Sequence, residues 1–132
     1  MKQQIVYLKI KGLKPHEEIR PARLASLRRK ILADGVFTTP IFVDRKTGVI
    51  LDGHHRIAAA RALGLRKIPA YLINYSAAAV KVEWRKGALP SATVKAIVLC
   101  LAARGRLLPP KSTRHRFPVR RLDPAPRLGE LR

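Results

Sequence analysis

The sequence predicts an α+β domain, in which helices pack on a small mixed β-sheet and the active site lies at strand ends. Two observations support this class. Short apolar runs with two-residue alternation are interleaved with segments of three- and four-residue apolar spacing, which indicates strands mixed with helices. The 132 residues are enough for one hydrophobic core, and a hydrophobic fraction of 47% is typical of a globular chain.

The N-terminal segment predicts a strand followed by a helix. Gln4–Lys11 alternates along its length, as a strand does. After a loop, Pro21–Ala33 has helical apolar spacing, and Pro21 suits the first turn of a helix. Asp34 and Gly35 end this helix, because glycine readily takes the left-handed conformation of a helix cap.

The middle of the chain predicts a hairpin and a second helix. Pro40–Asp44 and Val49–Asp52 are apolar runs separated by the turn Arg45–Gly48. His54–Leu63 is rich in alanine and is followed by Gly64, which predicts a helix with a glycine end.

The following part predicts two strands and a third helix. Ile68–Ile73 is a strand, and a second one includes the alternating Val80, Val82 and Trp84. Ser91 is expected to cap a helix that runs to about Ala103. The lone cysteine, Cys100, lies in the apolar part of this helix and is expected to be a buried thiol.

The composition changes from Arg104 onward, where prolines and basic residues dominate. Closely spaced prolines exclude long regular structure, so this segment is either an ordered loop that closes over a ligand or a disordered tail. We assign residues 1–118 to the domain and residues 119–132 to a basic, proline-rich tail.

The charge restricts the class of partner. The 28 Lys and Arg against 8 Asp and Glu give a formal net charge of +20, which favours phosphate-bearing partners, either nucleotides or nucleic acid. Part of this charge is an ordinary solvated surface. No apolar run approaches the ~20 residues that span a bilayer, so we expect a cytoplasmic protein without a membrane partner.

The segment Ile50–Arg56 carries the chemistry. A helix start attracts phosphate through its free N–H groups, and Gly53 allows close approach of the backbone to an anion. Arg56 offers a bidentate fork to phosphate, and His54 and His55 can donate hydrogen bonds or move protons. Asp52, at the strand end, would hold a metal ion or orient a histidine.

Two other interpretations of this segment are open. Asp52 would cap the helix in an ordinary turn, with the two histidines solvated. A zinc site is a third interpretation, but no nearby cysteine or further histidine completes a ligand set at zinc spacing.

The segment Leu51–Arg61 resembles the ParB/sulfiredoxin superfamily, in which a strand, a Gly-x-x-Arg turn and a helix form a nucleotide or phosphate pocket. Its form here, Asp52-Gly53-His54-His55-Arg56, is similar to that of the archaeal free L-serine kinases. Position 54 lacks the cysteine of the sulfiredoxins, so sulfenyl-phosphate chemistry is not expected.

Three further stretches resemble the serine kinases. Leu13–Glu17 is similar to the segment that supplies their proposed catalytic base, which implies Glu17 as the base, with Glu18 in reserve. Pro109–His115 is similar to their phosphate-contacting loop, and Val80–Trp84 to the segment that brings a tryptophan to the pocket. The resemblance implies nucleotide contacts from Gly53, His54, His55, Arg56, Lys111, Ser112, Thr113, Arg114 and His115. It implies substrate contacts from Trp84, His55 and Arg114.

The function that the resemblance implies is phosphoryl transfer from ADP or ATP, with Mg²⁺ at Asp52, to the hydroxyl of free L-serine. The chain departs from the family in length, because only residues 85–108 join the tryptophan strand to the C-terminal loop. The alternative function is nucleic-acid binding without catalysis, as in the partitioning proteins. The single helix after Ser91 is too little for a helix-turn-helix region.

Overall fold

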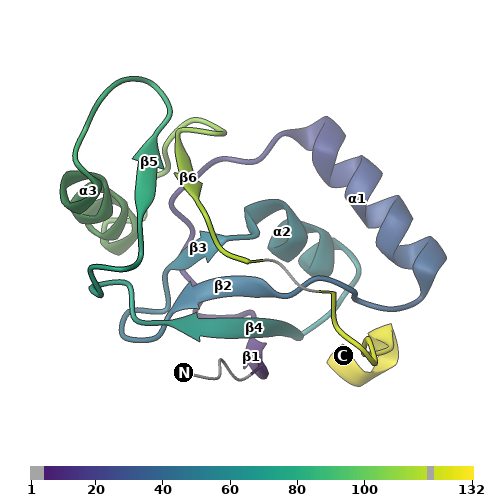
Figure 1. Ribbon diagram of the computed structural model, residues 1–132. Helices are drawn as coiled ribbons and strands as arrows, with labels where there is room; N and C mark the ends of the chain where they lie inside the picture. Colours follow the sequence, from purple (N-terminus) through teal and green to yellow (C-terminus); the bar gives the residue numbers. More distant parts are fainter. Residues whose placement is uncertain (1–4, 119–120) are drawn as a thin grey trace.

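The computed structural model describes residues 5–118 and 121–132, and it has the predicted α+β architecture (Figure 1). No helix within these ranges is both long and apolar enough to cross a membrane. The strands are β1 (Ile5–Lys9), β2 (Ile41–Asp44), β3 (Ile50–Asp52), β4 (Lys67–Ile73), β5 (Val82–Trp84) and β6 (Thr113–His115). The helices are α1 (Pro21–Asp34), α2 (His54–Ala62), α3 (Ser91–Ala103) and the 3₁₀ helix η1 (Leu128–Leu131).

The main sheet has the strand order β1-β4-β2-β3. β2 and β4 run parallel, whereas β1–β4 and β2–β3 are antiparallel, so the predicted mixed sheet is confirmed. The predicted hairpin is the β2–β3 pair, with Phe42 opposite Asp52.

Both faces of the sheet are covered, which explains why β2 is buried along its whole length. Successive side chains of a strand point to opposite faces. Ile41 and Val43 accordingly pack in one core with α1, α2 and η1, whereas Phe42 packs in a second core with β5 and α3. Figure 1 shows α1 and α2 grouped apart from α3, which lies beside β5 and β6.

Helix α1 has the predicted bounds within one residue. It starts at Pro21 and ends at Asp34, and it is capped by Gly35, whose φ of 70° is left-handed and whose N–H donates to Ile31 O at 3.0 Å. Ile31 is buried, but the next residue, Leu32, is half exposed. α1 packs against α2, so the two helices form one layer over the sheet.

A second, two-stranded sheet pairs β5 with β6. Its register places Trp84 opposite Thr113 and Val82 opposite His115. The surrounding prolines had suggested only a loop or a tail here, because a three-residue strand has no periodicity that a sequence window detects. Thr113–His115 gains its extended conformation from a partner strand some thirty residues earlier in the chain.

Two expectations for α3 are wrong. Ser91 does not cap the helix with its side chain; its Oγ instead accepts a hydrogen bond from Val82 N at 3.0 Å and ties α3 to β5. Cys100 is an exposed free thiol. α3 buries Val94, Val98 and Ala102, and Cys100 does not share their stripe.

The described part of the predicted tail returns to the domain. Leu128 and Leu131 of η1 are buried in the same core as Ile31, and Arg66 N donates to Leu131 O at 2.8 Å. Residues 119–120 of the tail, and Gln4 of the predicted first strand, lie outside the described residues. The boundary at residue 118 stays a prediction.

Candidate active site

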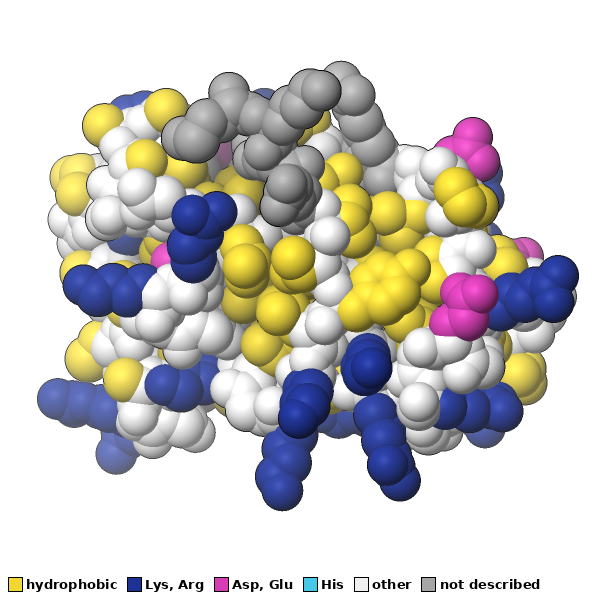
Figure 2. Space-filling model, turned by 90° about the horizontal axis from the view of Figure 1, so that it is seen from below, with side chains coloured by type: hydrophobic (Ala, Val, Ile, Leu, Met, Phe, Trp, Pro, Cys, Tyr) yellow, Lys and Arg dark blue, Asp and Glu magenta, His cyan; other side chains and the backbone are white. Residues whose placement is uncertain are grey.

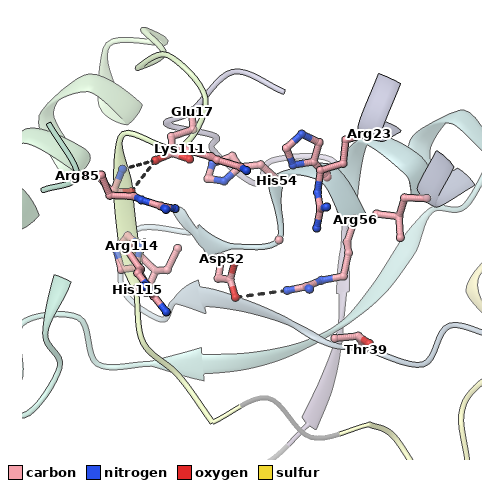
Figure 3. Close-up of a pocket in the computed structure, with 15 residues that line it drawn as sticks. Glu17, Arg23, Thr39, Asp52, His54, Arg56, Arg85, Lys111, Arg114 and His115 are labelled. Atoms are coloured by element: carbon pink, nitrogen blue, oxygen red, sulfur yellow. Dashed lines mark hydrogen bonds and ion pairs between the residues drawn. The ribbon is translucent and has the colours of Figure 1, made fainter. Parts of the chain in front are cut away.

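A cavity of about 390 Å³ opens where β3 ends, α2 begins and β6 passes (Figure 3). Arg85, Arg114 and His115 line one side of it, Arg23 and Arg56 the other, with Asp52 between them. The full lining is Glu17, Arg23, Leu27, Thr39, Leu51, Asp52, Gly53, His54, His55, Arg56, Arg85, Lys111, Thr113, Arg114 and His115. Five of these side chains are cationic and two are carboxylates, so the cavity suits an anion larger than one phosphate.

Gly53 forms the turn from β3 into α2, and no other residue fits there. Its φ of 108° lies in the region that favours glycine. A Cβ on Gly53 would overlap Cγ2 of Ile41 and lie 2.9 Å from the Ile41 Cβ. Among the described residues no side chain caps α2, so Asp52 is not a capping aspartate, and the N-terminus of the helix faces the cavity.

Arg56 projects from the first turn of α2 toward Asp52. Its Nη2 lies 3.5 Å from Asp52 Oδ2 (Figure 3). Its Nε and Nη2 are buried, and neither makes a hydrogen bond within the described ranges. Burial lowers the pKa of Arg56 from its usual value, although a guanidinium keeps its charge at any physiological pH. Buried donors without acceptors are costly, so they indicate a place for an anionic ligand.

The two histidines of the motif have fixed tautomers. A backbone N–H can only donate, so His54 Nε2 accepts from His16 N at 3.1 Å and His55 Nε2 from Arg20 N at 3.0 Å. In the neutral rings the proton therefore lies on Nδ1. Burial lowers the pKa of His54 well below its usual value and, to a smaller extent, lowers that of His55.

Glu17 is positioned by β6. Its Oε1 accepts hydrogen bonds from Thr113 N at 2.8 Å and from Thr113 Oγ1 at 2.6 Å. The side chain is 13% exposed and lines the cavity. Within the described part of the chain its Oε2 takes no hydrogen bond, which leaves one carboxylate oxygen for a ligand. The sequence motif around residue 113 thus orients Glu17 from almost a hundred residues away.

Two further histidines support this arrangement, the buried His16 and the part-buried His115. His16 donates from Nδ1 to Ile50 O at 2.8 Å, and its ring lies 4.5 Å from that of His54 and 5.7 Å from that of His115. His115 Nε2 lies 2.8 Å from Tyr75 Oη. Burial is the main cause that lowers the pKa of His16 to about 4 and that of His115 to about 3. The cluster is therefore neutral at pH 7.

The loop before β6 presents Lys111 to the cavity. Lys111 has a φ of 59°, which is uncommon for a residue other than glycine and costs conformational energy. Ser112 holds the loop, because it is fully buried and its Oγ donates to Pro109 O at 2.7 Å. Arg114 follows on β6 with an exposed side chain at the cavity edge.

Most of the residues expected at the site lie together, with two exceptions. Ser112 and Trp84 do not line the cavity. Ser112 donates a hydrogen bond to Pro109 O within its own loop, and the partly buried Trp84 packs against the second core. Arg23 and Arg85 line it without having been predicted. Neither belongs to a motif, because their side chains reach the cavity only through the packing of α1 and the pairing of β5 with β6.

The described residues offer two candidate positions for a metal ion. Donor atoms of His16, Glu17 and His54 lie within 4.8 Å of one another, but one nitrogen of each ring is engaged by backbone and Glu17 Oε1 by Thr113. Asp52 has a 40% exposed carboxylate beside the cationic wall. Mg²⁺ prefers a few carboxylate oxygens together with phosphate oxygens and water, so Asp52 fits it better.

The fold and the cavity define an α+β domain in which a helix N-terminus and five cationic side chains converge on one anion-binding cavity. The ParB N-terminal domain family model matches residues 1–83, and the chain belongs to that family.

The chain is similar to several archaeal proteins. It is 43% identical to the ATP-dependent L-serine kinase of Staphylothermus marinus over 82 residues, which cover 59% of this chain and 32% of the relative. It is 39% identical to that of Desulfurococcus mucosus over 105 residues, which cover 76% and 40%. A ParB-like protein of Sulfolobus acidocaldarius is 38% identical over 93 residues, covering 70% and 46%. The chain thus spans between about a third and a half of the length of these relatives.

Solved structures agree on the fold. A free serine kinase in complex with AMP has a TM-score of 0.81 at 17% identity, covering 100% of this chain and 95% of that one. A conserved hypothetical protein from Pyrococcus furiosus has a TM-score of 0.84 at 19% identity, covering 100% and 99%. The predicted ParB/sulfiredoxin-like fold is confirmed.

Proposed function

We propose that this chain is a kinase domain that transfers a phosphoryl group from ADP or ATP to the hydroxyl of free L-serine, giving O-phospho-L-serine. The observation that carries the proposal is a positioned carboxylate, Glu17, at the edge of a cavity lined by five cationic side chains. The named L-serine kinases among its relatives support the choice of acceptor and of an adenine nucleotide as donor.

The donor phosphates would lie against the N-terminus of α2, with Arg56 and the Lys111 loop around them. Their oxygens would accept hydrogen bonds from Nε and Nη2 of Arg56, neither of which makes a hydrogen bond within the described residues. His54 and His55 would donate from Nδ1, the nitrogen that their backbone contacts leave protonated. Asp52 would hold Mg²⁺, which neutralises phosphate charge when bound.

The acceptor would lie between Glu17 and the transferred phosphorus. As the serine oxygen forms its new bond to phosphorus, the bridging P–O bond of the nucleotide breaks and ADP or AMP leaves. Glu17 takes the hydroxyl proton, on Oε2, during the attack. Arg85 and Arg114 would pair with the serine carboxylate, since both are cationic and lie on the Glu17 side of the cavity (Figure 3), and Arg114 would also contact the donor phosphates. His55 and Trp84 stay predicted substrate contacts from the resemblance.

The direct test is incubation with ADP or ATP, Mg²⁺ and a panel of free amino acids, followed by mass spectrometry for phosphorylated product. Serine alone should gain 80 mass units per phosphoryl group, roughly the mass of HPO₃ in the transfer reaction. Absence of phosphorylated product with every amino acid and both nucleotides would reject the proposal. ADP and ATP are cytoplasmic metabolites, so we propose that the reaction takes place in the cytoplasm.

A further inference from the structure

His16 is a fully buried side chain beside the candidate active site, and the proposed mechanism leaves it without a role. It does not line the cavity itself, but its ring contacts the rings of His54 and His115, which do. The other three histidines of the chain all line the cavity, and none is seen on the face shown in Figure 2. A polar ring buried in this position needs partners for both of its nitrogens.

The contacts of His16 determine where its proton lies. Its Nδ1 lies 2.8 Å from Ile50 O, and a carbonyl oxygen can only accept, so Nδ1 carries the proton. Burial is the main cause that lowers the pKa of His16 to about 4, so the ring is neutral at pH 7 and Nε2 has a free lone pair. Among the described residues, the Thr113 hydroxyl, at 3.2 Å, is the only donor that reaches this lone pair.

The Thr113 hydroxyl has one proton and two acceptors. Its Oγ1 lies 2.6 Å from Glu17 Oε1 and 3.2 Å from His16 Nε2. An ionised carboxylate is the stronger acceptor, and 2.6 Å is a typical length for a hydrogen bond from a hydroxyl to a carboxylate. While Glu17 is ionised, the proton therefore points to Glu17. His16 Nε2 is then a buried acceptor without a donor, which is unfavourable.

We propose that the Thr113 hydroxyl turns from Glu17 to His16 when Glu17 takes the serine proton, which makes His16 a positioning residue for the general base; this inference rests on the proposed function. The O–H bond of serine breaks and a new O–H bond forms on Glu17 Oε2. Thr113 keeps its own proton and only redirects its hydrogen bond. Glu17 Oε1 loses its charge but still accepts from Thr113 N at 2.8 Å, so the side chain stays in place. The new hydrogen bond to His16 stabilises the protonated base, and hence the transition state more than the ground state.

Two simpler roles for His16 agree less well with its surroundings. Transfer of the proton itself to His16 would create a buried imidazolium. The rings that face it, His54 from α2 and His115 from β6, also have pKa values lowered by burial, so the cluster does not favour a positive charge. A purely structural role explains the hydrogen bond to Ile50 O, but it does not explain a lone pair directed at a hydroxyl that Glu17 already engages.

Nitrogen-15 NMR of the histidine rings in the full chain tests the turn of the hydroxyl without a kinase assay. Glu17→Gln places a neutral group at the position of the protonated base, so the Thr113 hydroxyl should turn to His16. The Nε2 resonance of His16, assigned by its loss in His16→Asn, should then move upfield, as a ring nitrogen does when it accepts a hydrogen bond. Adding Thr113→Val should abolish this shift. The same Nε2 resonance in the parent chain and in Glu17→Gln would overturn the proposal.

Kinetics of two matched His16 variants separate the acceptor from the structural hydrogen bond. The Asn side chain can donate to Ile50 O but is too short to reach Thr113, whereas Gln places an acceptor near the position of Nε2. His16→Asn should lower kcat by ~2- to 10-fold with KM and nucleotide affinity unchanged, the contribution of one neutral hydrogen bond. His16→Gln should restore most of this loss. Equal losses of kcat in the two variants, or a change in KM instead of kcat, would contradict the assignment.

The effect of His16 should also require the Thr113 hydroxyl. In a Thr113→Val chain, His16→Asn should change kcat by less than about 2-fold, because the group through which His16 acts is absent. Thr47→Val is the matched control, since it removes a hydroxyl that donates to Asp44 Oδ2 at the same 2.6 Å but away from the cavity; kcat should be retained. An undiminished effect of His16→Asn in the Thr113→Val chain would overturn the proposal. A parent chain that makes no phosphoserine would reject the proposed function, and the NMR result would still decide whether the hydroxyl turns.

Discussion

Glu17 and Asp52 are the two carboxylates of the cavity, and their surroundings differ. Glu17 is 13% exposed and is held at two points by Thr113, whereas Asp52 is 40% exposed and faces Arg56. Two carboxylates in different environments are suited to different roles. Glu17, which is fixed by hydrogen bonds and has one free oxygen, is suited to proton transfer. Asp52, which is more exposed and lies beside the cationic side chains of the cavity, is suited to binding a metal ion.

At the residue scale, Glu17→Gln should lower kcat by ~10²–10⁴ and leave nucleotide affinity almost unchanged, since that is the usual contribution of a general base. The amide keeps the acceptor oxygen that Thr113 requires, so the fold of the site is retained. Steady-state kinetics and nucleotide titration measure the two effects. A fully active variant would remove Glu17 from the mechanism.

Asp52→Asn should raise the Mg²⁺ concentration that half-saturates the reaction, because a neutral amide is a weaker ligand for Mg²⁺ than a carboxylate. The rate at saturating Mg²⁺ should fall less than in Glu17→Gln. Mg²⁺ titrations of both variants and of the parent chain compare the two carboxylates. An unchanged Mg²⁺ dependence in Asp52→Asn would place the ion elsewhere.

Arg56→Ala should weaken nucleotide binding by ~1.5–3 kcal/mol, the contribution expected of one charged hydrogen bond. Arg114→Ala should have an effect of similar size. Isothermal titration with ADP, ATP and AMP in the presence of Mg²⁺ measures the loss. The exposed Arg104→Ala serves as control for net charge; equal losses at positions 56 and 104 would contradict a specific contact.

At the scale of elements, the β3–Gly53–α2 turn sets the direction of the site. Because φ is positive at Gly53 and Ile41 packs beneath it, the strand turns sharply and delivers the helix N-terminus to the cavity. Residues of the first helical turn then face the ligand without further support. β6 supplies the opposite wall through its pairing with β5.

Gly53→Ala should destabilise the chain more than Gly64→Ala. Both glycines have positive φ, which costs an alanine about 1–2 kcal/mol. A Cβ at Gly64 meets nothing within 4 Å, whereas at Gly53 it overlaps Ile41. Urea unfolding of the two variants separates backbone strain from the overlap. Equal losses of unfolding free energy in the two variants would show that Ile41 can move away from the added Cβ at no measurable energetic cost.

At the scale of the whole molecule, the fold brings together a neutral histidine cluster, in which His16 is fully buried and His54 and His115 are part-buried. The unfolded chain binds protons at these histidines near pH 6.5, while the folded chain does so only near pH 4 at His16 and pH 3 at His115. Stability is therefore fully present above pH 6.5 and is lost as the pH falls below it, by up to ~1.4 kcal/mol per pH unit for each histidine.

His115→Gln should reduce the slope of the unfolding free energy against pH by the contribution of one histidine, because glutamine does not titrate. Glutamine also retains a polar group near the position of Nε2. Urea unfolding between pH 7.5 and 5.0 avoids most carboxylate titration and measures the slope. The slope is informative even if the variant is less stable throughout. An unchanged slope would mean that His115 is protonated in the folded chain.

The local elements and the central motif were determined by the sequence itself. Helix α1 follows from Pro21, its apolar spacing and Gly35, and the hairpin follows from two apolar runs around a turn. Such features depend on neighbours within a few residues, which is the range that periodicity and capping describe. Asp52, Gly53 and Arg56 could be chosen for the same reason, because strand end, turn and helix start are consecutive.

Only the tertiary structure decided which distant groups meet. Contacts between segments far apart in the chain bury His16 and form the hydrogen bond between Thr113 and Glu17. Such contacts also place Arg23 and Arg85 on the cavity lining. The exposure of Cys100 and the role of Ser91 depend on which stripe of α3 meets β5. An apolar run predicts that one face of a helix is buried. Which face is buried depends on packing against other elements, and a short stretch of sequence does not contain those elements.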